Sequence, residues 1–275
     1  MRHIAIVATL CFAALSARAE TIVQMWDFAD PAKSESRFRD ALGAASGDWR
    51  LELQTQIART YSLRARYAEA HRLLDEIEPR LAAAGLKPRL RYLLERGRTF
   101  NSAGDKAAAQ PLFRQAFELG RAGGEEDLAI DAAHMVAIVA GGEKALAWNR
   151  DALAMAESAR DPAARRWRAS LLNNIGVELN DLGRHEEALA YFKRALDAYS
   201  ERGDPRTIRI ARWMVAHTLR LLGRNQEALK MQLALERELK AAGEDDPYVR
   251  EELGLLYTAL GELEKARDYA TPARR

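Results

Sequence analysis

Six alanines recur along the chain at nearly constant intervals, each inside the same local pattern. They are Ala70, Ala109, Ala145, Ala188, Ala228 and Ala266, separated by 39, 36, 43, 40 and 38 residues. Self-similarity at such a period is typical of an array of small units that pack on their neighbours, not of one compact core. The repetition therefore predicts a repeat protein and favours binding over catalysis as its role.

The fourth repeat, residues 171–205, shows the unit most clearly. Apolar residues recur at helical spacing over 171–182 and again over 188–199, with Gly183 as a turn signal between them. The unit is therefore two antiparallel helices joined by a short loop. Gly176 lies inside the first helix, where glycine costs about 1 kcal/mol relative to alanine. We expect it to allow close approach of the second helix, with Ala188 as the matching small residue.

This spacing of small and large residues resembles that of the tetratricopeptide repeat (TPR). The family pattern is a small and then a large apolar residue in the first helix, a small loop residue, an alanine, and an aromatic and a further small residue in the second helix. The fourth repeat supplies Gly176, Leu179, Gly183, Ala188, Phe192 and Ala195; the second supplies Gly97, Phe100, Gly104, Ala109, Phe113 and Ala116; the first supplies Ala58, Tyr61, Ala65, Ala70, Leu74 and Ile77; the last supplies Gly254, Tyr257, Gly261 and Ala266.

The third and fifth repeats match this pattern less well. Asn149 and Gln232 stand where an aromatic residue is expected, and we expect the neighbouring Trp148 and Leu233 to take over the packing. The resemblance implies an all-α, right-handed superhelical solenoid of about six helix-turn-helix repeats over residues 48–275, the last one truncated. A generic helical bundle is the alternative fold, but it does not require small residues that recur in register.

Three Asp-Pro pairs indicate where first helices begin. Asp161-Pro162, Asp204-Pro205 and Asp246-Pro247 each read as an N-cap followed by proline in the first turn. Because each pair lies well upstream of the small residue of its repeat, these helices are predicted to be a turn or more longer than the family minimum.

Residues 1–19 have the pattern of a secretory signal peptide. A short basic start precedes an apolar run over 4–15 that is too short to span a bilayer, and Ala17-Arg18-Ala19 fits a cleavage site. We therefore expect cleavage after Ala19, a periplasmic or secreted protein, and no membrane span in the mature chain. A lipoprotein, through Cys11, and a buried first helix are the alternatives.

The segment 20–47 is expected to cap the first repeat. Asp30-Pro31 indicates a helix that runs to about Leu42, and it resembles the second helix of a repeat without its first. Trp26 and Phe28 are expected to anchor this cap; a ligand-binding role is the alternative.

At the other end Pro272 cuts the last helix short, so the last repeat frays, contacts another molecule or continues in a longer protein.

Charge and composition exclude several functions. The chain carries 42 Lys+Arg and 40 Asp+Glu, and removal of residues 1–19, which contain two arginines and no acid, leaves 40 of each. This balance argues against nucleic-acid binding. Arginines nevertheless cluster over 160–168 and 202–212, and stacked repeats would bring the clusters together, either as a solvated face or as a surface for an anionic partner.

No catalytic motif, metal-ligand spacing or cofactor-binding loop is present in the sequence, so we expect no enzyme, metal or cofactor.

The concave side of such a solenoid is the expected binding surface. In proteins this chain resembles, one face of each first helix contacts an extended peptide or a partner helix, and fixed offsets from the small residue define it. The candidate groove residues are Arg98, Asn101, His134, Asn173, Asn174, Asn180, Trp213, His217, Arg220 and Glu251. Asparagine both donates and accepts hydrogen bonds, so it can hold a peptide backbone. Alternatively, these residues solvate the wall or bridge repeats.

The leading hypothesis is an exported, non-catalytic scaffold or adaptor that binds a protein or peptide in its groove. One alternative is the accessory repeat region of a cell-wall-acting enzyme, for which Glu251 is the one groove carboxylate available as general acid. Another is a structural protein that self-associates through its C-terminal repeat.

Overall fold

The computed structural model describes residues 21–270, and all its regular elements are helices. In chain order they are α1 (Ile22–Met25), α2 (Pro31–Ala44), α3 (Gly47–Leu63), α4 (Tyr67–Ile77), the 3-10 helix η1 (Glu78–Ala83), α5 (Leu86–Ser102), α6 (Lys106–Gly123), α7 (Glu126–Ala140), α8 (Gly142–Ser158), α9 (Pro162–Arg165), α10 (Trp167–Asp181), α11 (His185–Ser200), α12 (Pro205–Leu221), α13 (Asn225–Ala241), α14 (Pro247–Ala259) and α15 (Leu263–Ala270). The predicted all-α class is confirmed.

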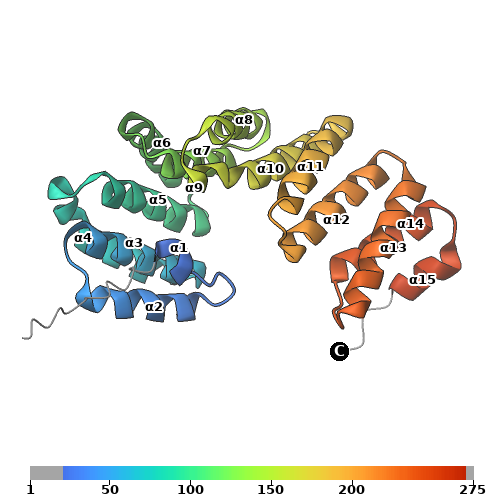
Figure 1. The fold of residues 1–275 in the computed structure, drawn as a ribbon, viewed down its shortest axis with the longest axis horizontal. Helices are drawn as coiled ribbons and strands as arrows, with labels where there is room; N and C mark the ends of the chain where they lie inside the picture. The colour runs from blue at the N-terminus through green and yellow to red at the C-terminus, as the bar shows by residue number, and fades with distance from the viewer. Residues whose placement is uncertain (1–20, 271–275) are drawn as a thin grey trace, which may run out of the picture.

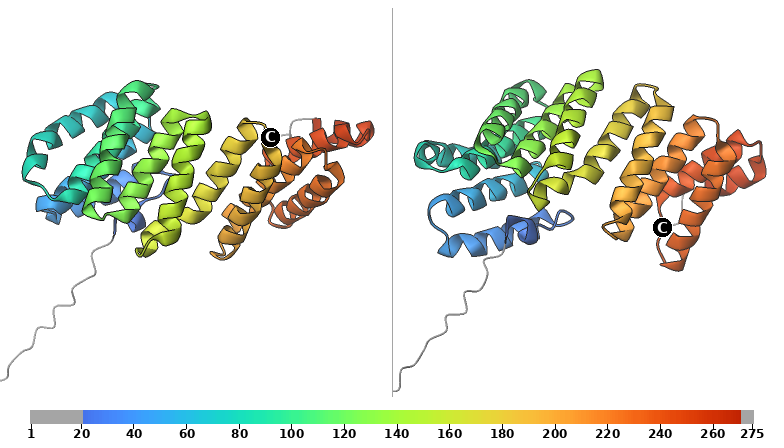
Figure 2. Two further views of the ribbon diagram at one scale, coloured as in Figure 1. Left: turned by 90° about the horizontal axis from the view of Figure 1, so that it is seen from above. Right: turned by 45° about the horizontal axis from the view of Figure 1, so that its top comes forward.

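The helices form hairpins that follow one another round an arch. The pairs α3–α4, α5–α6, α7–α8, α10–α11, α12–α13 and α14–α15 each pack together, and each second helix also packs against the next first helix. Figure 1 shows α6 and α8 on the outer side of the arch, with α5 and α7 nearer its opening. The turned views show the hairpins side by side along the array (Figure 2). This is the predicted solenoid and not a bundle.

A phenylalanine ring against a glycine closes two of the hairpins. A Cβ built on Gly176 would lie 2.6 Å from the ring of Phe192, and one on Gly97 would lie 2.5 Å from the ring of Phe113. Both rings are completely buried. Gly176 therefore leaves room for the aromatic side chain of the second helix. The expected contact partner, Ala188, is not among the three atoms nearest to that position, all of which belong to Phe192.

The turn inside five of the six hairpins has a residue with positive φ at the same position. Gly104, Gly183, Gly223 and Gly261 have φ angles between 72° and 91° there, where glycine is unstrained. The first repeat has Ala65 at this position, with φ of 57°. A side chain with a Cβ costs about 1 kcal/mol in this conformation, so the first hairpin carries strain that the others lack.

Two of the three predicted Asp-Pro starts each begin a continuous helix, of 17 residues in α12 and of 13 in α14. Asp204 and Asp246 accept hydrogen bonds from backbone N–H groups in the first turns of α12 and α14, and a proline follows each. Asp161 likewise caps α9, but that helix ends at Arg165 and α10 begins at Trp167. The first helix of the fourth repeat is therefore interrupted at Arg166, which the sequence did not predict.

Polar side chains fill the core position of two second helices. Asn149 and Gln232 are themselves buried, so Trp148 and Leu233 do not replace them as expected but pack beside them, half-buried. Neither amide atom of Gln232 has a hydrogen-bond partner among the described residues. An unpaired buried amide costs about 1–3 kcal/mol, and this makes the fifth repeat a weak point of the array.

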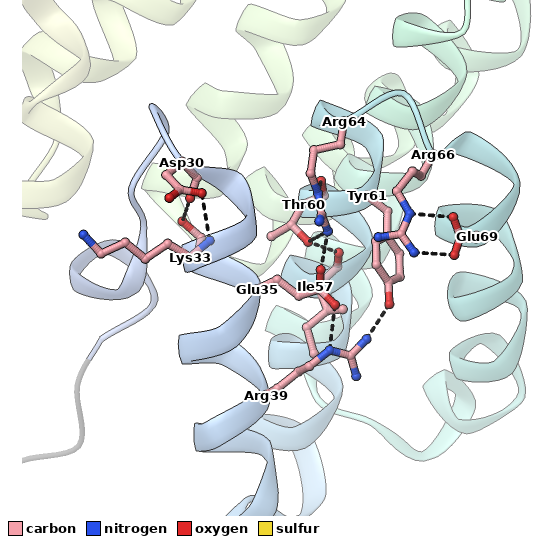
Figure 3. Close-up of polar contacts among 11 residues, drawn as sticks. Asp30, Lys33, Glu35, Arg39, Ile57, Thr60, Tyr61, Arg64, Arg66 and Glu69 are labelled. Atoms are coloured by element: carbon pink, nitrogen blue, oxygen red, sulfur yellow. Dashed lines mark hydrogen bonds and ion pairs between the residues drawn. The ribbon is translucent and has the colours of Figure 1, made fainter.

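The N-terminal segment caps the first repeat, as the fold class predicts. Helix α2 packs on α3 in the way each second helix packs on the next first helix. Figure 3 shows the polar contacts that join them: Arg39 donates to the hydroxyl of Tyr61, and Arg64, directly after α3, donates to Glu35. Within α2, Arg39 also donates to Glu35 at 2.6 Å. Phe38 is fully buried beneath this layer. The predicted signal peptide, residues 1–19, lies outside the described residues.

The last hairpin is less covered than the others. Ala266 is only half-buried, whereas the five preceding repeat alanines are completely buried, and Leu263 of α15 is 57 % exposed. No further repeat packs on α15 within the described residues. Pro272, which was expected to end this helix, lies outside them.

The glycine–phenylalanine contact predicts a reversal of the usual glycine-to-alanine effect. Gly176→Ala should lower the free energy of unfolding by about 1–2 kcal/mol, because overpacking against Phe192 outweighs the gain in helix propensity. Gly43 is the matched control, since a Cβ there meets no atom within 4 Å, and Gly43→Ala should be stabilising. Urea denaturation measures both changes. The loss should disappear in a Phe192→Leu background; a Gly176→Ala chain more stable than wild type would contradict the contact.

Candidate functional site

The inner faces of successive first helices are joined by side chains at two fixed positions. The residue one after the small residue of a repeat meets the residue two before the small residue of the next repeat. The pairs are Arg59–Glu95, with Nη1 and Oε1 3.5 Å apart; Arg98–Asp131, in direct contact; His134–Asn174, with Nδ1 and Nδ2 3.4 Å apart; and His217–Glu252, with Nδ1 and Oε2 3.1 Å apart. We call this series the inner ladder.

The ladder is most strongly charged across α3, α5 and α7. Arg98 donates to Glu95 at 2.7 Å as well as to Asp131, and Gln56 donates to the same Glu95 oxygen at 3.4 Å. Glu95 is only 1 % exposed. These groups are therefore occupied by one another inside the protein, and Arg98 is a bridge between repeats in the described structure.

Burial and pairing shift the ionisation of these groups in opposite directions. Burial alone would lower the pKa of Arg98 and raise that of Asp131, but their mutual attraction outweighs it, so the pKa of Arg98 is raised and that of Asp131 lowered. For Arg59 burial dominates and lowers the pKa, and burial also lowers the pKa of His134. The lowered pKa of His134 favours the neutral imidazole at neutral pH.

The N-terminal segment covers the first rung of the ladder. The Trp26 indole N–H donates to Gln56 at 3.0 Å, and Trp26 also packs edge-on against Phe38 of α2. Phe28 stacks on Trp26, and the guanidinium of Arg59 lies 5.2 Å and 5.3 Å from the two ring centroids. Trp26 thus anchors the cap, and the N-terminal part of the inner face is filled by residues of the chain itself.

In the middle of the inner face, two of the candidate asparagines contact other side chains of the protein. Asn174 lies against His134, and Asn180 donates to Thr218 at 2.9 Å while its oxygen lies 3.0 Å from the imidazole of His185. The rung between α10 and α12 is apolar, because Val177 and Met214 occupy the two positions. The polar ladder is therefore interrupted there.

Toward the C-terminus Glu252 is the central acceptor. It accepts from Arg220 Nε at 2.5 Å and lies 3.1 Å from His217, and it is 2 % exposed. Hydrogen bonds from these two residues lower its pKa despite its burial. Sequence reasoning selected the neighbouring Glu251, which is exposed. The recurrence of polar residues two before the small residue, in Gln56, Glu95, Asp131, Asn174 and Glu252, was the signal that would have found it.

The remaining inner surface is open and partly apolar. Ile210 and Tyr248 are 50 % and 67 % exposed, Leu255 is 43 % exposed, and Trp213 is half-buried. Trp213 stacks on His217 and contacts the ring and the carbonyl of Tyr248. Helical spacing places Ile210 with Trp213 and Tyr248 with Leu255 on one face of α12 and α14. We call these four residues the C-terminal patch.

Two candidate asparagines retain unused hydrogen-bonding capacity. The side-chain oxygens of Asn101 and Asn173 are buried and have no partner among the described residues. Asn173 stands at the same offset in α10 as Trp213 in α12. Of the ten predicted groove residues, the structure leaves Glu251 exposed and Trp213 half-buried, leaves the oxygens of Asn101 and Asn173 buried without a partner among the described residues, and engages the other six in contacts between side chains.

Within residues 21–270 the structure shows neither a cluster of His, Cys, Asp and Glu suited to a metal ion nor a helix long and apolar enough to cross a membrane. Glu251, offered as a general acid, lies exposed on α14 and not in a cleft.

Comparison with known proteins places the fold. Residues 167–234 match the model of the tetratricopeptide repeat family. These residues, which form α10, α11, α12 and part of α13, are similar to tetratricopeptide repeats. No curated protein sequence matches the chain significantly.

Several solved structures share the TPR arrangement. A signal transduction ATPase with numerous domains and a TPR sensor, from Pyrococcus horikoshii, is similar over 87 % of this chain and 38 % of its own, with 14 % identity and a TM-score of 0.71. The apo form of RapI is similar over 87 % and 69 %, with 12 % identity and a TM-score of 0.70. NprR in complex with its cognate peptide NprX is similar over 88 % and 72 %, with 17 % identity and a TM-score of 0.55. The chain thus spans little more than a third of the ATPase, and at these identities the likeness shows the fold alone.

The Glu252 cluster predicts a pH-dependent contribution to stability. Because the pKa of Glu252 is lowered from 4.5 in the folded protein, its contribution is present above that value and is lost as the pH falls through the folded pKa. Glu252→Gln should lower the free energy of unfolding at pH 7 by about 1–3 kcal/mol, and the difference from wild type should shrink toward pH 3. Denaturant titrations at a series of pH values measure this.

Glu251→Gln is the matched control, because it removes the same charge from the adjacent, exposed position. Its effect should stay within about 0.5 kcal/mol at every pH. Equal effects of the two substitutions would show that Glu252 makes no special contribution.

Proposed function

We propose that this TPR protein is a non-catalytic scaffold that binds a peptide or protein segment on the C-terminal half of its inner face. The observation that carries the proposal is the contrast between the two halves. In the N-terminal half Arg59, Glu95, Arg98 and Asp131 pair with one another, and the Trp26 and Phe28 rings of the chain's own N-terminal segment lie over Arg59. In the C-terminal half apolar side chains of the first helices α12 and α14 remain exposed.

The C-terminal patch offers the two kinds of contact that peptide recognition requires. Trp213 and Tyr248 supply aromatic surface of the kind that dominates binding energy at interfaces. Exposed Glu251, at the same offset in α14 as Trp213 in α12, can pair with a basic group of the bound segment. The complex of NprR with its peptide, on a similar fold, supports peptide binding by an array of this kind.

The apparent signal peptide supports action outside the cytoplasm, in the periplasm or as a secreted protein. The cell-wall enzyme gains less support, since its one candidate general acid, Glu251, is exposed.

Peptide selection tests the proposed surface. Peptides chosen from a displayed random library on the chain 20–275 should bind Trp213→Ala/Tyr248→Ala at least about tenfold more weakly than wild type, since loss of an aromatic anchor costs 2 kcal/mol or more at an interface. Fluorescence anisotropy measures the affinities. A photo-crosslinking residue at position 210 should label the same peptides.

Mass spectrometry of the exported full-length chain should show a mature start at Glu20.

The control removes two exposed apolar residues from the N-terminal half, in Phe28→Ala/Leu63→Ala, which are 61 % and 49 % exposed in the wild type. This control should bind the peptides as wild type does. Peptides that lose affinity for the control and not for the patch variant would refute the assignment of the binding surface.

A further inference from the structure

A second surface feature lies at the edge of the array, between the third and fourth repeats. A cavity of about 370 Å³ opens there between the end of α8, the short helix α9, the start of α10 and the end of α11. Its charged lining consists of Glu157, Arg165, Arg166, Arg168, Glu201 and Arg202. None of these residues belongs to the C-terminal patch or to the inner ladder.

The two carboxylates of the cavity are already engaged. Arg168 lies 3.3 Å from Glu201 and 4.0 Å from Glu157, and Arg194 donates to Glu157 at 3.1 Å. The negative charge on the wall is therefore shared with Arg168 and with an arginine outside the cavity. The other three arginines of the lining, Arg165, Arg166 and Arg202, therefore have no carboxylate among the described residues to neutralise their charge.

Those three arginines contact no carboxylate in the part of the chain that the structure describes; besides backbone oxygens, the guanidinium of Arg202 lies 5.9 Å from the ring centroid of Tyr199. Arg165 donates to the carbonyl of Arg160 at 2.7 Å, and Arg202 donates to the carbonyl of Arg166. None of Arg165, Arg166 and Arg202 forms an ion pair with a carboxylate within residues 21–270. The interruption of the first helix at Arg166 thus brings three guanidinium groups, two from the start of the fourth repeat and one from its end, to one cavity.

We propose that this cavity binds a small organic phosphate monoester. Three uncompensated guanidinium groups suit a group with nearly two negative charges, and a phosphate monoester carries about −1.5 to −2 at pH 7. Guanidinium forks bind phosphate oxygens in pairs. The volume lies within the range of about 300–1,000 Å³ typical of small-molecule sites. Ala156, Pro162 and Ala198 add apolar wall for the organic part of the ligand.

Calorimetric titration with phenyl phosphate tests the site on the chain 20–275. We expect saturable binding that weakens as salt is added. Arg166→Gln/Arg202→Gln should weaken it at least about tenfold. Arg209→Gln/Arg212→Gln removes the same charge from arginines of α12 that are paired with Glu244 and Glu238, and should leave the affinity within about twofold of wild type.

Benzenesulfonate, which keeps the ring but carries a single charge, should bind more weakly than phenyl phosphate. If circular dichroism shows that Arg166→Gln/Arg202→Gln does not fold, the variant Arg165→Gln/Arg166→Gln, at two exposed positions, takes its place. Absence of saturable binding to wild type, equal weakening in the cavity and control variants, or equal affinity for the two ligands would overturn the proposal.

Discussion

The arrangement of the inner face depends on one recurring contact, in which a side chain of one first helix reaches a polar side chain of the next. Arg59, Arg98, His134 and His217 each extend from their repeat to Glu95, Asp131, Asn174 and Glu252. A buried charge is costly unless it is paired. The Glu95 and Glu252 carboxylates therefore constrain how the neighbouring helices can be placed. The residues that lie nearest to the expected ligand site are thus also those that join the repeats.

This constraint divides the inner face into two parts. The charged rungs and the cover formed by Trp26 lie in the N-terminal half, and the polar series is interrupted where the apolar Val177 and Met214 stand at the equivalent positions of α10 and α12. Beyond this interruption the inner face of α12 and α14 carries exposed apolar side chains while Glu252 remains buried beneath. A partner can bury Trp213 and Tyr248 further without breaking the Glu252 cluster, so binding and stability use different atoms there.

Much of the fold was predictable from the sequence, because small residues that recur in register indicate closely packed pairs of helices and few other arrangements require them. Gly97 and Gly176 marked the first helices, and Asp204 and Asp246 marked helix starts that the structure confirms. The candidate site was less predictable. Offsets from the small residue identified the inner face but could not tell which side chains a neighbouring repeat would engage, since that depends on how closely successive helices approach. Arg98 and Glu251 show both outcomes, the first buried in a pair and the second exposed.

The central claim is that the polar residues of the N-terminal inner face hold repeats together. A double-mutant cycle between Arg98 and Asp131 measures this directly, with Arg98→Met, Asp131→Asn and the double variant unfolded in urea. The account predicts a coupling free energy of about 1–3 kcal/mol, with each single variant clearly less stable than wild type and the double variant losing less than their sum. Additive changes with no coupling would contradict it, because the two side chains would then contribute independently and the ladder would not join the repeats.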